Sequence, residues 1–294
     1  MSEPTRSGVI HDIGYRHYDG PRLGRFAITR ALTISSLRHA YGLGRTGKSK
    51  VMPILLLAVM VVPVVILVGV ENAMKLEDPP IVPVNYIGYL QPVIGLYLAS
   101  QAPQLFSRDL RYRSIVLYLA RPPRSTDYVL AKLTALTAAL MVLIGLPLVI
   151  LYAGALLAKY DFVDMSKEFL TALATALLVS VLLAVIGGLI AAATPRRGFA
   201  VAAIIATLTV SFTAVITTTA ILDPDVTMQG AAERYTQLAS PFSLAQTLSR
   251  FVLRDRSDWM PTTQQGLVFA AAYVLLVALC VWGVNSRYAK VARG

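Results

Sequence analysis

The sequence predicts an all-α integral membrane protein with six transmembrane helices and both termini in the cytoplasm. Three observations support this fold class. The 294 residues are 56% hydrophobic and only 15% charged, whereas an average soluble domain is about 25% charged. Six stretches are apolar enough, and long enough, to cross a hydrocarbon core, which takes about 20 residues of helix. The charges between these stretches are distributed unevenly, as the positive-inside rule requires.

The predicted spans cover most of the chain after residue 50. The fourth offers Ala184, Gly188 and Ala192 at four-residue spacing, a small-residue face that lets two membrane helices approach closely. We expect a cytoplasmic N-terminal segment over 1–50 and a transmembrane domain over 51–294. The six spans are 52–70, 84–106, 129–157, 169–193, 199–222 and 266–286, and the second is the least apolar.

The charge distribution sets the predicted orientation. With both termini inside, the cytoplasmic segments hold 20 of the 27 Lys and Arg residues but only 5 of the 16 Asp and Glu residues. An excess of basic residues on the cytoplasmic side is typical of membrane proteins. The net charge of +11 is therefore explained without a nucleic-acid partner.

Residues 23–41 are predicted to form an amphipathic helix at the membrane interface, before the first span. At about 100° per residue, its apolar side chains share one face, with Arg25, Thr29 and Ser36 opposite. Arg30 falls on the apolar face, where its stem can snorkel. A generic membrane-surface helix is the alternative to one that contacts a partner. The apolar face consists of Leu23, Phe26, Ala27, Ile34, Leu37 and Tyr41.

The stretch "GLGRTGKS", Gly42–Ser49, matches the phosphate-binding P-loop pattern. A P-loop works between a buried strand and the N-terminus of a soluble helix, where backbone N–H groups hold the phosphates. Here no β-branched strand precedes the motif, and a spanning helix follows it. No apolar strand ends in an acidic residue that would hold Mg²⁺. We therefore expect this match to be a coincidence.

Metal binding and membrane catalysis are also disfavoured. His11, His17 and Asp19 fit no standard zinc spacing. All 43 charged residues fall in loops or at helix ends, whereas an ion-coupled carrier normally keeps an ionisable residue inside the membrane. An intramembrane enzyme would need a nucleophile with a base, or a metal. The function classes that remain are a channel, a scaffold and a transporter powered by another protein.

The loop between the second and third spans, "SRDLRYRSIVLYLARPPRSTDYVLAK", is predicted to begin with a short cytoplasmic helix. Its residues recur at three- and four-residue steps until Pro122 and Pro123 break the helix, and Asp127 marks the start of the next one. Such a helix suits docking into a partner's groove. A solvated basic loop that only fixes orientation is the alternative. The recurring residues are Leu110, Ser114, Leu117 and Tyr118, flanked by Arg108, Arg111 and Arg113.

This loop resembles the coupling segment of permeases from the type-2 ATP-binding-cassette (ABC) exporter family. Six helices with such a loop after the second match that family across most of the chain. Arg113 and Ala131 stand where the family has glycines, so they depart from its pattern. The matching positions are Asp109 for the acidic residue, Ser114 for a threonine, Leu117 in a leucine-rich turn, and then Pro122, Arg124 and Lys132.

The resemblance implies a permease subunit in a bacterial plasma membrane. Its partners would be a dimer of a separate ATPase, which holds the ATP and Mg²⁺, and a second permease copy or a paralogue. The loop over 108–121 would be the coupling helix, and the N-terminal helix would also touch the ATPase. Helices 1, 2 and 5 would form the dimer interface.

Between the fifth and sixth spans, "SPFSLAQTLSRFVL" predicts a short helix with Ser240 as N-cap and Pro241 at its first position. The resemblance places short extracellular helices here. A loop that packs on the membrane surface is the alternative. The expected apolar face comprises Leu244, Leu248, Phe251 and Val252.

Polar, uncharged residues in the second and fifth spans are candidates for a substrate pathway. Their chemistry favours a hydrophobic or amphipathic substrate, moved outward in an exporter, although each could simply serve interhelical packing. A structural or assembly membrane protein without transport is the alternative function, and a membrane enzyme is a weaker one. The candidates are Tyr86, Tyr97, Gln101 and Gln104 in the second span, and Thr207 and Ser211 in the fifth.

Overall fold

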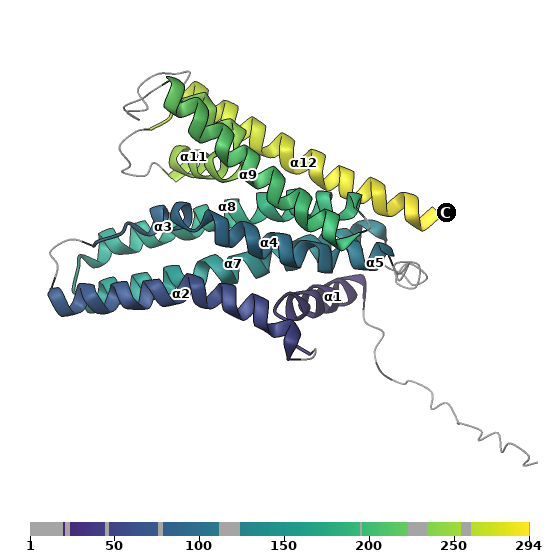
Figure 1. Cartoon of the computed structure of the whole chain (residues 1–294), viewed down its shortest axis with the longest axis horizontal. Coiled ribbons are helices and arrows are strands. Elements are labelled where there is room, and N and C mark those ends of the chain that lie inside the picture. The colour runs from purple at the N-terminus through teal and green to yellow at the C-terminus, as the bar shows by residue number, and fades with distance from the viewer. Residues whose placement is uncertain are drawn as a thin grey trace, which may run out of the picture.

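In the computed structural model of the chain, the described residues form a bundle of helices and contain no strand (Figure 1). The structure describes residues 20, 24–44, 47–75, 79–111, 124–194, 196–222, 234–253 and 260–293. The elements are α1 (Arg25–Ala40), α2 (Lys48–Met74), α3 (Pro83–Tyr89), α4 (Gln91–Leu105), α5 (Ser107–Arg111), α7 (Ser125–Leu157), α8 (Phe162–Ala193), α9 (Arg197–Leu222), η1 (Thr236–Ala239), α11 (Pro241–Leu253) and α12 (Thr263–Arg293).

Five helices, α2, α7, α8, α9 and α12, are long and apolar enough to cross a membrane. Helices α2, α9 and α12 carry large apolar side chains on the outside of the bundle, among them Ile66, Val210 and Trp282, each more than 60% exposed. Such surfaces would promote aggregation in water, whereas they contact lipid acyl chains favourably. The chain is therefore an all-α, multi-pass membrane protein. These helices correspond to predicted spans one, three, four, five and six.

The remaining predicted span, 84–106, is not one continuous helix. It consists of α3 and α4, which meet at Leu90. Pro92 lies in the first turn of α4, where its missing N–H costs nothing, but it could not continue a helix from α3 because its ring would clash with the preceding turn. Helix α4 is deeply buried, since Ile94, Tyr97 and Leu98 have no exposed surface.

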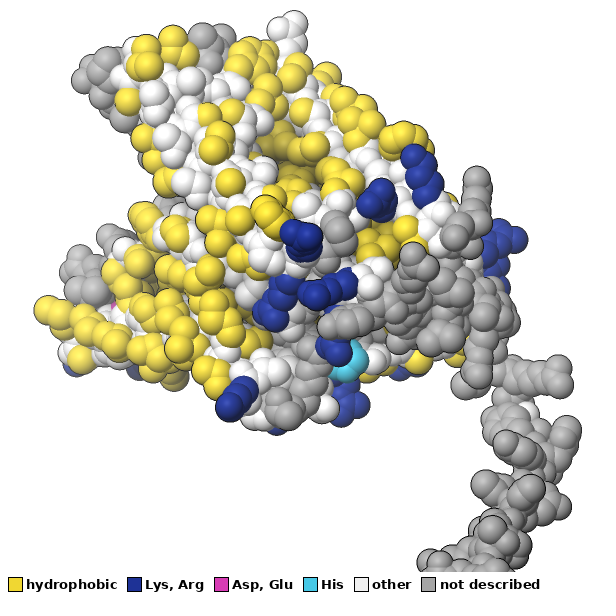
Figure 2. Space-filling model, turned by 45° about the vertical axis from the view of Figure 1, so that its right-hand side comes forward, with side chains coloured by type: hydrophobic (Ala, Val, Ile, Leu, Met, Phe, Trp, Pro, Cys, Tyr) yellow, Lys and Arg dark blue, Asp and Glu magenta, His cyan; other side chains and the backbone are white. Residues whose placement is uncertain are grey.

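The long helices run in alternating directions, so their ends gather at two opposite ends of the bundle (Figure 1). We call one of them the basic end. Figure 2 brings this end forward and shows Lys and Arg side chains gathered there, beside a largely hydrophobic surface. The predicted grouping of the charged segments thus agrees with the arrangement of the helices. The basic end contains the first residues of α2, α7 and α9 and the last residues of α5, α8 and α12.

Helix α8 lies at the centre of the bundle and packs through the small-residue face predicted from the sequence. Ala184, Gly188 and Ala192 are all buried. A Cβ added at Gly188 would lie 3.0 Å from Leu133 of α7. The neighbouring Gly187 is tighter still, because an added Cβ there would lie 2.7 Å from the Leu98 side chain of α4. These glycines let α4, α7 and α8 approach one another.

Helix α1 forms as predicted, and the residues of its predicted apolar face are partly exposed and partly packed against the core. Phe26 is 82% and Ile34 46% exposed, whereas Ser36 and Ala40 are buried. Of the apolar set, Leu37 and Tyr41 pack against the core, and Leu23 lies outside the described residues.

Helix α11 also begins where predicted, at Pro241, and buries Leu244 and Leu248. Two details of the prediction are wrong. Val252 points away from the core and is 62% exposed. The Ser240 hydroxyl is buried without a hydrogen-bond partner among the described residues, so its side chain does not cap the helix. The helix start is fixed instead by the Ser240 carbonyl, which accepts the Leu244 N–H at 2.8 Å.

The close approach at Gly187 predicts a large effect of substitution there. Gly187→Leu should destabilise the protein by about 1–3 kcal/mol, because an overpacked site must displace its neighbours. Gly69→Leu in α2 is the matched control, because nothing lies within 4 Å of a Cβ added at Gly69. Thermal unfolding of both variants in detergent would measure the difference. Equal melting temperatures would contradict the close packing of α4 on α8.

Candidate functional site

The candidate site lies at the basic end, where the two helices that flank residues 112–123 contact each other. Asp109 lies on α5 and Lys132 on α7, and Lys132 Nζ lies 2.9 Å from Asp109 Oδ2. The hydroxyl of Tyr128, one turn before Lys132, donates a hydrogen bond to the same carboxylate oxygen. Lys132 Nζ also lies 5.4 Å from the centre of the Tyr128 ring, within reach of a cation–π interaction.

Helix α12 joins this site through Tyr288, which is fully buried. Its hydroxyl donates to the carbonyl oxygen of Phe106 at 3.0 Å. Its ring centre lies 5.5 Å from that of Tyr128 and 6.4 Å from that of Phe106, the latter in an edge-on arrangement. Aromatic pairs at these separations add to the stabilisation that comes from burial alone.

Helix α8 is attached at the same point, because the buried Ser107 hydroxyl donates to the Ala191 carbonyl oxygen at 2.6 Å. The result is a compact set of contacts between α5, α7, α8 and α12, which we call the Asp109 cluster. The cluster fixes the geometry of the chain on both sides of 112–123. Its members are Phe106, Ser107, Asp109, Tyr128, Lys132, Ala191 and Tyr288.

Lys132 is a buried cation, since its side chain is only 9% exposed. It lies seven residues, about 11 Å, from the start of α7, a helix of about 50 Å. This position agrees with the expectation that charges lie near helix ends. Desolvating an ammonium is costly unless a counterion and hydrogen bonds compensate. Asp109 and Tyr128 supply that compensation.

Helix α1 is tied to α7 by three polar contacts along its length. An Arg25 guanidinium nitrogen lies 2.5 Å from Asp127 Oδ2, and this carboxylate oxygen also accepts the Arg124 N–H at 3.0 Å, which confirms Asp127 as part of the α7 start. Further along, the Tyr41 hydroxyl donates to the Ala139 carbonyl oxygen at 2.7 Å. Burial raises the pKa of Tyr41 to about 12, so the hydroxyl stays protonated near neutral pH.

These contacts place α1 along α7 from Asp127 to Ala139, about 18 Å of helix. Midway, the Thr33 and Thr134 hydroxyl oxygens lie 3.4 Å apart. Residues 25–41 therefore pack along α7, and any movement of α1 would affect α7 directly.

The structure accounts for only part of the sequence-predicted coupling set. It brings Asp109 and Lys132 together and leaves Arg108, Arg111 and Arg124 exposed at the same end. The sequence pattern contained no signal for Tyr288, which lies some 180 residues from Phe106 along the chain. The other predicted residues, Arg113, Ser114, Leu117 and Pro122, lie outside the described residues, as do His11, His17 and Asp19.

The candidate pathway residues of the second span are buried or partly buried. The Tyr86 hydroxyl donates to the Met60 carbonyl oxygen of α2. Tyr97 and Gln101 are buried, and the Tyr97 hydroxyl and Gln101 Oε1 have no hydrogen-bond partner in the part of the chain that the structure describes. Gln104 is partly buried and donates to the Ser100 carbonyl oxygen at 2.9 Å.

The candidates of the fifth span hydrogen-bond to their own helix. The Thr207 hydroxyl donates to the Ala203 carbonyl oxygen at 2.8 Å, and the Ser211 hydroxyl donates to that of Leu208 at 2.9 Å. Such local bonds satisfy a hydroxyl in an apolar setting. Both hydroxyls are therefore satisfied within α9 in this conformation.

A larger space lies between α4 and α9 and was not predicted. This groove has a volume of about 380 Å³ and is mostly apolar. Pro92 and Gly95 leave room for the groove on the α4 side. Two such residues within one helical turn are the sequence signal that could have indicated the groove. The groove is lined by Gln91, Pro92, Gly95, Leu96, Ile205, Leu208, Thr209, Phe212 and Phe242.

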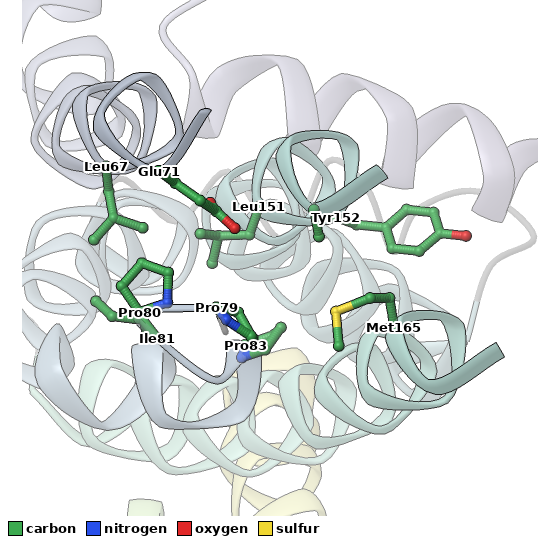
Figure 3. Close-up of a pocket in the computed structure, with 10 residues that line it drawn as sticks. Leu67, Glu71, Pro79, Pro80, Ile81, Pro83, Leu151, Tyr152 and Met165 are labelled. Atoms are coloured by element: carbon green, nitrogen blue, oxygen red, sulfur yellow. The ribbon is translucent and has the colours of Figure 1, made fainter. Parts of the chain in front are cut away.

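At the end opposite to the basic end, a cavity of about 20 Å³ separates α2 from the segment before α3 (Figure 3). Glu71, in the last turn of α2, lines this cavity and is only 3% exposed, and its Oε1 has no hydrogen-bond partner among the described residues. The volume suffices for about one water molecule. Pro79, Pro80 and Pro83 close the cavity on one side.

The P-loop match occupies a bend between two helices. Helix α1, not a strand, precedes it, and Lys48 begins the spanning helix α2. Gly42 has a φ of +68°, and an added Cβ would lie 2.6 Å from the Ser49 carbonyl oxygen. Gly42 thus serves a tight turn between α1 and α2.

The Asp109 cluster predicts a strong dependence of stability on its ion pair. Lys132→Ala or Asp109→Ala should each destabilise the protein by about 3 kcal/mol, because each leaves a buried charge without its counterion. The double variant Asp109→Leu with Lys132→Leu should lose less than the sum of the two single changes. Denaturant unfolding in detergent would measure these free energies.

The matched control is Lys167→Ala, which breaks the exposed pair with Asp164, 3.6 Å apart. It should cost less than about 1 kcal/mol. If Lys132→Ala costs no more than this control, the ion pair does not hold the basic end together.

No known protein family and no curated protein sequence matches this chain.

Proposed function

We propose that the chain is the membrane-spanning permease subunit of an ATP-driven exporter of the type-2 ABC family, powered by a separate ATPase. The observation that carries the proposal is the Asp109 cluster. It fastens the helices on both sides of 112–123 to each other and to α8 and α12. A force applied to this segment would therefore move several helices together, as a rigid-body transition requires.

The basic end offers a surface on which an ATPase could exert that force. Arg108 and Arg111 on α5 and Arg124 before α7 are exposed there. Helix α1 adds a second contact point, because its ion pair with Asp127 links it to the start of α7. In this proposal the ATPase dimer holds the ATP and Mg²⁺, and this chain binds neither.

The proposed topology has six spans, with both termini and the basic end in the cytoplasm. Helices α3 and α4 together form the second span. From Pro83 to Leu105 they cover 23 residues, about 35 Å of helix, which exceeds the roughly 30 Å of hydrocarbon. The positive-inside rule supports the orientation. Helix α11 and η1 would then lie at the outer side of a bacterial plasma membrane.

The proposed substrate is hydrophobic or amphipathic. The groove between α4 and α9 supports this, because Leu96, Phe212 and Phe242 give it an apolar lining and Gln91 supplies a polar group. Six spans make half a transporter, so a second copy or a paralogue completes it. Helices α2, α4 and α9 carry the proposed interface, and α2 and α9 present extensive exposed apolar faces.

The docking proposal predicts that charge reversal on α5 abolishes ATPase binding. The chain should copurify with an ABC ATPase encoded in the same genome. Arg108→Glu combined with Arg111→Glu should lose the complex and the stimulated ATP hydrolysis, because the reversed, acidic surface of α5 would repel an acidic partner surface. The melting temperature of the purified chain should change little, because interactions of exposed charged side chains contribute less than about 1 kcal/mol.

Lys159→Glu with Lys167→Glu, at exposed positions on the end opposite to the basic end, is the control with equal charge change. If no ATPase binds the unaltered chain, a structural or assembly role replaces transport. If the α5 variant binds as tightly as the control, the coupling assignment fails while transport remains open.

The topology can be tested separately because Cys280 is the only cysteine and is buried. In a Cys280→Ala background, Ser114→Cys should react with a membrane-impermeant maleimide only in inside-out vesicles. Asp161→Cys, between α7 and α8, should react only from the opposite side. Labelling of both positions from the same side would contradict the six-span arrangement.

A further inference from the structure

We propose that a cleft between the ends of α8 and α12 binds the phosphate headgroup of an anionic phospholipid. The cleft lies at the basic end and has a volume of about 160 Å³. None of the residues that line this cleft belongs to the Asp109 cluster. The proposal requires only that the chain lies in a membrane, and it does not require that the chain transports a substrate. Its lining residues are Leu189, Ala192, Ala193, Gly283, Ser286, Arg287 and Lys290.

The cleft presents two cations and no acidic residue in its lining. Arg287 and Lys290 are three residues apart on α12, and both are exposed. Neither forms an ion pair within the part of the chain that the structure describes. Arg supplies paired N–H donors that match phosphate oxygens, and Lys adds a point charge. Their positions therefore suit one phosphate group.

The walls of the cleft explain why a small anion could enter between two helices. Ala192 and Ala193 on α8 face Gly283 on α12, so no large side chain fills the space. At Gly283 an added Cβ would lie 2.8 Å from the Leu189 side chain, which shows how closely the helices approach just below the cleft. The Ser286 hydroxyl donates to the Gly283 carbonyl oxygen at 2.9 Å, so its oxygen can still accept a hydrogen bond.

The surface beside the cleft identifies a lipid, rather than a soluble phosphate, as the occupant. Leu279 and Trp282 lie one to two turns before Ser286 on the same side of α12, and they are 54% and 70% exposed. A lipid whose phosphate contacts Arg287 and Lys290 would lay its acyl chains along these residues. Trp is favoured at this depth, between headgroups and tails. A soluble anion would use only the charges.

The test measures binding of phosphatidylglycerol and phosphatidylcholine to the purified full-length chain, by native mass spectrometry or by the lipid-dependent rise in melting temperature. Phosphatidylglycerol should bind more tightly. Each basic residue near a membrane contributes about 5-fold in affinity, so Arg287→Ala with Lys290→Ala should weaken binding about 30-fold. Arg30→Ala with Lys48→Ala removes the same charge from exposed positions outside the cleft and should leave binding unchanged.

A second variant separates a built site from general attraction to a basic surface. Ala193→Phe fills part of the cleft but keeps both cations, so it should also weaken phosphatidylglycerol binding. Equal binding of the two lipids, equal losses in the paired variants, or unchanged binding in Ala193→Phe would each overturn the proposal. Displacement of the lipid by an equal concentration of inorganic phosphate would overturn the lipid as occupant. None of these outcomes depends on an ATPase.

Discussion

The ion pair between Lys132 and Asp109 is the contact on which the basic end of the bundle depends. A buried ammonium so close to the membrane is tolerable only with a counterion and further polar contacts. Asp109 and the Tyr128 hydroxyl meet that need. Asp109 belongs to α5 and Lys132 to α7. The ion pair that compensates the Lys132 charge therefore also holds together the two helices that precede and follow residues 112–123.

The two ends of the bundle differ in how firmly they are joined. At the basic end, hydrogen bonds from Ser107 and Tyr288 link α5, α8 and α12 to the ion pair. Toward the opposite end, α9 and α12 diverge from α2 (Figure 1). In the proposed transporter, such an arrangement favours rocking of helices about their basic ends. The groove between α4 and α9 is a space whose shape such rocking would change.

The exposed basic residues on α5 and on α12 differ in how much apolar surface lies beside them. Exposed Arg108 and Arg111 on α5 suit an acidic protein surface, whereas Arg287 and Lys290 lie beside the exposed apolar Trp282 and suit a lipid. The surrounding apolar area distinguishes the two, because a phospholipid needs contacts for its tails as well as for its phosphate. In the two proposals, basic residues at one end of the bundle would thus serve a protein contact on α5 and a lipid contact on α12.

The sequence by itself determined the five long apolar helices, because span length and apolar composition are local properties of the chain. Tertiary packing decided the rest: which face of α1 is buried, that Lys132 meets Asp109, and that Tyr288 closes the cluster. Helical periodicity placed Phe26, Ile34, Leu37 and Tyr41 on one face of α1, but only Leu37 and Tyr41 pack against the core, whereas Phe26 and Ile34 are exposed. The α4–α9 groove likewise depends on how Gly95 and Leu208 meet. Such contacts join residues distant in sequence, and they follow from the shapes of packed surfaces, which no local pattern contains.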